Sequence, residues 1–320
     1  MSRRWTARAE PRLNRVPRLQ LLAAAALFST GGAAIKAITL DGWQVAGFRS
    51  GIAALTVFLI VPAVRRRPGF RLWARDPRVL LVGAAYAATM VLFVLANKLT
   101  TAANSIFLQS TAPLYILLLG PWLLREPIRA RDVLFIVVVG VALIPFFLSG
   151  GDASATAPDP ARGNVIALAS SVFWAFTVIG MRWLASSTPG GEAAFATVVA
   201  GNAMAFLVCL PFALPVRSSV PLDWVVIGYL GLFQIGLAYW CLTHGMRHVP
   251  ALEASIILLL EPALNPIWAW LVHDERPSGW ATLSGAFILG ATLAKGWWDE
   301  RSLAPSRPSG DPYAWQAPPD

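Results

Sequence analysis

The chain has 320 residues, of which 56% are hydrophobic and only 13% are charged, and its formal net charge is +9. About a quarter of the residues of an ordinary soluble domain are charged, so the composition excludes a large soluble domain and indicates a polytopic membrane protein. The positive charge comes from arginine-rich segments between apolar stretches. Such segments are typical of loops at an anionic membrane surface, and they give no reason to expect nucleic acid as a partner.

Ten apolar stretches are long enough to cross a bilayer as helices, which takes roughly 20 residues. They fall at about 19–38, 43–64, 78–97, 102–123, 131–149, 163–185, 192–215, 224–243, 252–272 and 279–298. The connections are mostly short, so successive helices are expected to be antiparallel neighbours. The first stretch follows several arginines and has some features of a secretory signal. It has a counterpart in the second half, however, and we therefore predict that it is retained as a helix.

The lysines and arginines are distributed unevenly between the two sides that ten spans define. Twenty of the 26 lie on the side of the termini, four lie on the opposite side, and two lie inside spans. Short loops rich in lysine and arginine stay in the cytoplasm. This asymmetry predicts a multi-pass protein of the cytoplasmic (inner) membrane with both termini in the cytoplasm.

Two segments, residues 104–127 and 254–277, have similar sequences that share a serine, a central proline and a closing glutamate, Glu126 and Glu275. A repeat of about half the chain in a membrane protein is typical of transporters built from two related halves. Each half has five spans, so the second half enters the membrane from the opposite side. The sequence therefore predicts an all-α membrane protein with ten transmembrane helices as two inverted-topology five-helix repeats.

The predicted domain organisation follows from this repeat. It consists of a cytoplasmic basic tail at 1–18, a first five-helix repeat at 19–149, a linker at 150–162, a second five-helix repeat at 163–298 and a disordered C-terminal tail at 299–320. Small polar residues and proline dominate the linker. The C-terminal tail is rich in proline, which is typical of disordered segments.

The ninth span carries the clearest resemblance to a known family. Its sequence, ASIILLLEPALNPIWAWLVHDERP, resembles the pattern of the drug/metabolite transporter superfamily, EamA type, and Arg49 in GFRSGIAAL is similar to the family's Phe-Arg pair in the second span. The fourth span departs from the pattern, because it has TAP where the ninth has LEP. The resemblance covers about residues 19–298. It implies an inner-membrane carrier that exports metabolites, amino acids or drug-like compounds.

Glu261 is the leading candidate for a functional residue, because it lies midway along the ninth span. A charged side chain there costs about 2.5–3.5 kcal/mol on insertion scales, so it is expected to face the bundle interior or a wet cavity. Pro262 follows and loosens the helix, while Asn265 and Trp268 are spaced to share the face of Glu261. That face can bind an amine, carry a proton, or both. The alternative is a protonated or ion-paired glutamate that holds helices together.

Arg49 is the expected partner of Glu261. It lies about 10 Å below the outer end of the second span, at 1.5 Å per residue. Three roles stay open for it: an ion pair with Glu261, binding of a substrate carboxylate, and a side chain that reaches outward to the membrane surface.

Four charged residues near the ends of spans are assigned structural roles. Lys36 and Arg182 are expected to extend to the membrane surface. Glu126 and Glu275 are expected to form ion pairs with the arginines beside them at the C-terminal ends of their helices.

Further polar and aromatic side chains are predicted to line the same site. These candidates are Gln109, Tyr86, Phe93, Trp174, Gln234 and Tyr239. Aromatic walls of this kind can stack on a substrate, and packing against lipid or other helices is the alternative for each ring. Enzyme motifs such as HExxH, GxSxG and Walker A are missing from the sequence. We therefore predict no catalytic residue, cofactor or metal, and expect a small-molecule substrate and the lipid bilayer as partners, with a homodimer left open.

Two functions fit these patterns. The first is a secondary transporter that exports small metabolites, amino acids or drug-like compounds by alternating access. The second is a non-transporting scaffold or lipid-handling protein that uses the same helical bundle. A cavity that contains Glu261 and opens to one side favours transport, whereas a fully packed bundle favours the scaffold.

Overall fold

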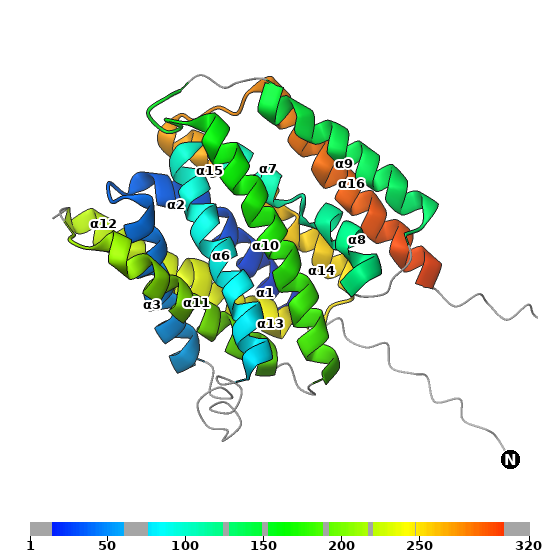
Figure 1. Cartoon of the computed structure of the whole chain (residues 1–320), viewed down its shortest axis with the longest axis horizontal. Coiled ribbons are helices and arrows are strands. Elements are labelled where there is room, and N and C mark those ends of the chain that lie inside the picture. Colours follow the sequence, from blue (N-terminus) through cyan, green and yellow to red (C-terminus); the bar gives the residue numbers. More distant parts are fainter. Residues whose placement is uncertain are drawn as a thin grey trace, which may run out of the picture.

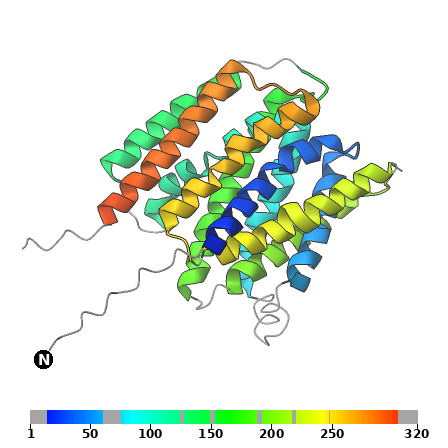
Figure 2. The same cartoon turned by 180° about the vertical axis from the view of Figure 1, so that it is seen from behind.

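The computed structural model describes residues 15–60, 76–123, 128–148, 153–187, 192–216, 220–246 and 248–303. Within these ranges every regular element is a helix, apart from one isolated bridge between Ser154 and Ala157. The helices form one bundle, from which α9 and α16 stand out together at one side (Figure 1). The same outlying pair is visible from behind (Figure 2).

The predicted spans correspond to single helices or to consecutive pieces of helix. In the first half these are α1 (Arg15–Ser29), α2 (Gly31–Ala37), α3 (Gly42–Ile60), α6 (Pro77–Leu99), α7 (Ala102–Gln109), α8 (Ala112–Leu123) and α9 (Ala130–Leu148). In the second half they are α10 (Pro160–Ser187), α11 (Glu192–Ala213), α12 (Pro221–Tyr229), the π-helix η1 (Leu230–Leu237), α13 (Ala238–Met246), α14 (Ala251–Leu258), α15 (Leu260–His273) and α16 (Gly279–Leu303).

Nine segments of the described chain are long and apolar enough to cross a membrane. The tenth predicted span is α16, which is 25 residues long and lies along α9. It is more polar because it contains Lys295 and, near its end, three consecutive charged residues at 299–301.

Helices extend past three of the predicted domain boundaries, and the first of them, α1, begins at Arg15, inside the predicted tail at 1–18. The helix α16 continues to Leu303, so residues 299–303 are helical rather than part of a disordered tail. Lys295 holds this last turn, because its Nζ lies 2.8 Å from Asp299. At the linker, α10 already begins at Pro160, where proline is favoured at a helix start, and Asp159 accepts a hydrogen bond from the backbone N–H of Arg162. Residues 304–320 lie outside the described ranges.

Corresponding helices of the two halves pack in corresponding ways. The second and seventh spans, α3 and α11, lie against each other, and so do the fifth and tenth, α9 and α16. The third span packs on the sixth as α6 on α10, and the eighth packs on the first as α13 on α1. This exchange of partners is what a pseudo-two-fold axis between inverted repeats produces.

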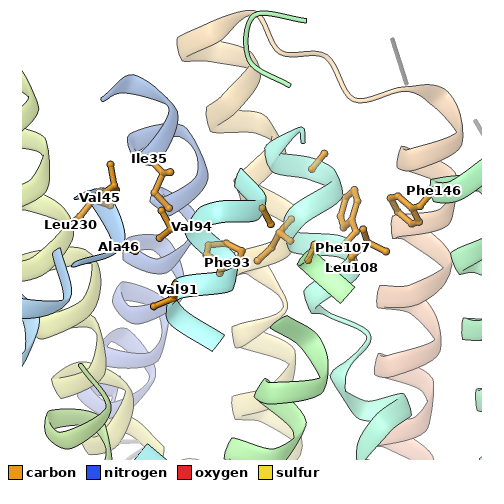
Figure 3. Packing of buried hydrophobic residues seen from close by; sticks show 14 of the residues in the cluster. Ile35, Val45, Ala46, Val91, Phe93, Val94, Phe107, Leu108, Phe146 and Leu230 are labelled. Atoms are coloured by element: carbon orange, nitrogen blue, oxygen red, sulfur yellow. The ribbon is translucent and has the colours of Figure 1, made fainter. Parts of the chain in front are cut away.

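Buried apolar side chains from both halves form one cluster. It includes Ile35 on α2, Val94 on α6, Phe107 on α7 and Leu230 on η1 (Figure 3). Lipid tails are as apolar as these side chains, so helix association in a membrane depends on close packing rather than on removal from water. The α3–α11 contact shows this closeness, because a Cβ added at Gly47 would lie 3.0 Å from that of Cys209.

Four spans are interrupted near their middle. The first breaks at Thr30, between α1 and α2, and the eighth contains η1. The fourth and ninth spans break at the positions that their prolines predict. Pro113 and Pro262 have no N–H to donate to the residue four positions earlier. Those residues are Gln109 and Leu258, at which α7 and α14 end.

Candidate functional site

A cavity of about 260 Å³ lies where the four interrupted spans meet. It is slightly smaller than the typical range of about 300–1,000 Å³ for ligand pockets. Seven of the ten predicted site residues line it, namely Arg49, Phe93, Gln109, Trp174, Gln234, Tyr239 and Glu261. These side chains come from six different spans, so the fold brings together residues that are far apart in the sequence.

Glu261 lies in the first turn of α15, directly after the break at Leu259. Its side chain is partly exposed and faces the cavity. Within the described chain, no hydrogen bond or ion pair joins its carboxylate to another residue. A carboxylate at mid-membrane depth is costly without a compensating group. The cavity is where water, a proton or the ammonium of a solute can supply that compensation.

Arg49 lines the same cavity but is held by the backbone of α6. Its Nη2 donates a hydrogen bond of 3.0 Å to the carbonyl of Met90 and lies 3.9 Å from the Met90 Sδ. The residue is 1% exposed, so it does not reach the membrane surface. Among the described residues it forms no ion pair with Glu261. Two of the three predicted roles are therefore not realised in this conformation, and contact with a substrate is the role that remains.

Aromatic rings form one wall of the cavity. The ring of Tyr239 meets that of Phe28 edge-on, with centroids 5.2 Å apart. Behind it, Tyr86 packs against Tyr239 at 5.8 Å and accepts a hydrogen bond from Asn202. Tyr86 was predicted to line the site, but it is fully buried and supports the wall from behind. Trp174 is a lining residue on α10.

Two amides add polar groups to the lining. Gln109 donates to the Ser170 hydroxyl at 3.0 Å, and Gln234 donates to the carbonyl of Phe28 at 3.5 Å. The Oε1 of Gln234 is buried and has no hydrogen-bond partner among the residues that the structure describes. An unsatisfied acceptor at a cavity wall is a group that a ligand or a water molecule can satisfy.

Asn265 and Trp268 do not line the cavity, which corrects the prediction that they share a binding face with Glu261. The cavity ends at the first turn of α15, because α1 and α2 cover the rest of that face. Asn265 is fully buried against Gly32 of α2. Trp268 donates a hydrogen bond of 2.9 Å to the Ser29 hydroxyl.

Several lining residues were not predicted. Phe28, Thr89 and Ser110 all face the cavity. Ser110 lies at the break between α7 and α8, and Phe28 immediately precedes the Ser-Thr-Gly-Gly sequence of the first break. The positions of the helix breaks are therefore the signal in the sequence from which Phe28 and Ser110 could have been predicted.

A buried ion pair closes one end of the bundle, between α2 and the C-terminal end of α15. The Nζ of Lys36 lies 3.0 Å from Glu275, and both side chains are less than 5% exposed. Lys36 also donates to the carbonyls of Thr100 and Thr156. Glu275 accepts a 2.6 Å hydrogen bond from the backbone N–H of Ala102, at the start of α7, where negative charge is favourable.

This arrangement corrects two predictions. Lys36 does not extend to the membrane surface, because its ammonium donates hydrogen bonds to two carbonyls and forms an ion pair with Glu275 inside the bundle. Glu275 pairs with Lys36 rather than with its neighbour Arg276, which lies 3.4 Å from Asp274 in an exposed pair. Arg182 is exposed as expected. Glu126 lies outside the described residues.

The opposite end carries a different ion pair. Arg18 of α1 forms two hydrogen bonds with the Glu253 carboxylate of α14. Both side chains are about one third exposed. The two ends of the bundle thus differ, because one is closed by a buried network and the other by a solvent-accessible pair.

The sequence profile of the EamA-like transporter family matches residues 18–148 and, a second time, residues 161–294. The chain belongs to the EamA-like transporter family. It is thereby a multi-pass membrane protein of the drug/metabolite transporter superfamily, and its two profile matches correspond to the two structural halves.

Several relatives are named transporters. An uncharacterized transporter of Methanothermobacter thermautotrophicus is 24% identical over 67% of this EamA protein and 65% of its own length, just under two thirds. Human solute carrier family 35 member G1 is 24% identical over 85% of this chain and 76% of its own. The aromatic amino acid exporter YddG of Ancylobacter novellus is 24% identical over 61% of this chain and 67% of its own.

A solved structure confirms the fold of this EamA protein. A crystal structure with 21% sequence identity superposes with a TM-score of 0.57, covering 89% of this chain and 98% of the other. At this identity the likeness shows the fold alone. The family and the transporter names support membrane transport, and the chemistry of transport depends on the site.

Proposed function

We propose that the protein is a secondary transporter that exports small organic solutes bearing an amine across the cytoplasmic membrane. The observation that supports this most directly is the carboxylate of Glu261, which has no partner among the described residues and faces a cavity bounded by four interrupted spans. Broken helices at mid-membrane are a recurrent feature of solute and coupling-ion sites in secondary transporters. The cavity also favours transport over the alternative of a non-transporting scaffold.

The two ends of the bundle support alternating access. In the proposed cycle, the buried Lys36–Glu275 network closes the end of the bundle that is away from the chain termini. The Arg18–Glu253 pair closes the end that is near the termini. The breaks at Thr30 and Leu259 lie between these two ends. They are the points at which α1 and α2, or α14 and α15, can change their relative angle while each piece stays rigid.

The lining indicates the class of solute. Glu261 offers a negative charge for an ammonium, Arg49 offers an N–H for a carboxylate, and Tyr239 offers an aromatic surface. An amino acid, above all one with an aromatic side chain, carries all three complementary groups. One relative is named an aromatic amino acid exporter, which fits this chemistry.

Transport by the purified protein in proteoliposomes tests the proposal. We would measure uptake of radiolabelled L-phenylalanine, L-leucine and methyl viologen under an imposed pH gradient. These probes are an aromatic zwitterion, an aliphatic zwitterion and an aromatic cation. We expect L-phenylalanine to accumulate above the level of protein-free liposomes, and to do so more than methyl viologen, which lacks a carboxylate for Arg49. If none of the probes accumulates above that level, the proposed solute class is wrong.

A further inference from the structure

The outlying helices α9 and α16 enclose a second, separate cavity. This groove has a volume of about 480 Å³ and is lined mainly by apolar side chains, among them Leu134 and Val138 of α9 and Phe287 and Gly290 of α16. Along α16 its lining extends from Leu283 to Trp298, 15 positions apart, which is about 22 Å at 1.5 Å per residue. One leaflet of a bilayer core is about 15 Å thick, so the groove is long enough for an acyl chain.

One end of the groove is basic. Arg131 and Lys295 line it there, beside Trp298. The same two cations also line an adjoining depression of about 450 Å³, to which Arg129 and Arg182 contribute. Tryptophan and long basic side chains are the residues that mark the headgroup level of a membrane. The apolar groove therefore leads into a basic pocket at that level.

Two carboxylates, Asp132 and Asp299, form ion pairs with cations at this basic end. Lys295 lies 2.7 Å from Asp132 and 2.8 Å from Asp299, and Arg131 lies 3.0 Å from Asp299. Arg129 is a further cation that lines the depression beside these pairs. The ion pairs hold Arg131 and Lys295 in place, which reduces the entropy cost of binding an anion.

We propose that the groove between α9 and α16 binds an anionic phospholipid, with an acyl chain along Phe287 and Gly290 and the phosphate at Arg129, Arg131 and Lys295. Arginine binds phosphate oxygens with two parallel N–H donors. A zwitterionic lipid has the same chains but no net charge for the basic end. The site is separate from the Glu261 cavity, and the inference does not depend on the proposed function.

Native mass spectrometry of the purified protein tests this assignment. We would titrate phosphatidylglycerol and phosphatidylcholine with identical acyl chains and expect tighter binding of the anionic lipid. Arg129→Gln removes one cation whose side chain is exposed at the depression. One charge at a membrane surface contributes about 1 kcal/mol, so this variant should bind phosphatidylglycerol about fivefold more weakly. Arg78→Gln, which removes a cation stacked on Trp183 elsewhere, should leave binding unchanged.

A second pair of variants tests the apolar part of the groove. A Cβ at Gly290 or at Gly140 meets nothing within 4 Å, but only Gly290 lines the groove. Gly290→Leu should fill it and abolish the tight binding, while Gly140→Leu on α9 should retain it. Equal binding of the two lipids, or equal losses in both glycine variants, would overturn the proposal. So would a lipid-independent change from dimer to monomer in Gly290→Leu, because a second copy of the chain would then occupy the groove.

Discussion

At the scale of single residues, the two halves differ most clearly at their central interruptions. Ala112 begins α8 in the first half and is buried, whereas Glu261 occupies the related position in the second half and faces the cavity. The prolines that follow, Pro113 and Pro262, break both spans in the same way. The prolines, which both halves have, break the helices at the site. The carboxylate of Glu261, which only the second half has, gives the site its negative charge.

The Lys36–Glu275 pair should be strongly coupled. Removing one partner leaves an uncompensated buried charge, which typically costs about 3–5 kcal/mol, whereas replacing both by apolar residues is often nearly neutral. We therefore expect Lys36→Met to lower the melting temperature in detergent markedly, and Lys36→Met with Glu275→Leu to recover most of the loss. Thermal unfolding of both single variants and the double variant measures the coupling. Additive losses would mean that the pair contributes no interaction of its own.

Two tryptophans predicted for the same site should behave differently. Trp174 lines the cavity, whereas Trp268 is bonded to Ser29 outside it. Aromatic contacts contribute about 0.5–1.5 kcal/mol, so Trp174→Ala should raise the KM for L-phenylalanine about threefold to tenfold. Trp268→Ala should lower thermal stability and leave the KM of the protein that remains folded unchanged. A KM increase in Trp268→Ala alone would contradict the assignment of the cavity wall.

At the scale of elements, the first span shows how a helix break and a close contact between helices occur at the same place. The first span turns at Thr30 and continues into α2 through Gly31 and Gly32. A Cβ at Gly32 would lie 2.4 Å from the Asn265 Oδ1 and 2.9 Å from the Cβ of Ala102. Glycine is required at this position because α2, α7 and α15 meet there.

Replacing Gly32 should therefore separate these helices. Overpacking of a tight contact costs about 1–3 kcal/mol, so Gly32→Ala should destabilise the protein by about that amount. The matched control is Gly228→Ala on α12, where the added Cβ meets nothing within 4 Å and helix propensity favours alanine. Melting temperatures of the two variants check this prediction. A loss in Gly228→Ala as large as in Gly32→Ala would show that the contact with Asn265 is not the cause.

Sequence reasoning predicted the spans well because apolar length is a strong signal in a membrane protein. It also predicted the break before Pro262, since a missing N–H has a local effect. It failed for Lys36 and Glu275, whose pairing depends on how segments distant in the chain meet. It failed for Asn265 and Trp268 for the same reason, because helical spacing gives a common face but does not show that α1 and α2 cover it.

At the scale of the whole molecule, the packing of corresponding helices relates the two halves by a pseudo-two-fold axis, with the cavity between them. The distribution of basic residues, 20 of 26 on the side of the termini, predicts that this bundle has its termini in the cytoplasm. With this orientation, the buried Lys36–Glu275 network is predicted to lie at the outer end.

Cysteine labelling in intact cells checks this orientation. The natural cysteines, Cys209 and Cys241, are buried and would be replaced by alanine to remove background. A cysteine introduced by Ser278→Cys, between α15 and α16, should react with a membrane-impermeant maleimide from outside. One introduced by Arg301→Cys, in the last turn of α16, should react only after lysis. The reverse pattern would show that the bundle has the opposite orientation.

The central claim is that the Glu261 carboxylate, which has no partner in the part of the chain that the structure describes, takes part in transport. Its most direct test is uptake of L-phenylalanine by proteoliposomes containing Glu261→Gln, beside the matched Glu300→Gln control on the exposed end of α16. We expect Glu261→Gln to keep the melting temperature of the unmodified protein within a few degrees and to retain less than about a tenth of its uptake, which corresponds to 1.4 kcal/mol or more. Glu300→Gln should transport normally. Unchanged uptake by Glu261→Gln, with the same dependence on pH, would show that this carboxylate is structural.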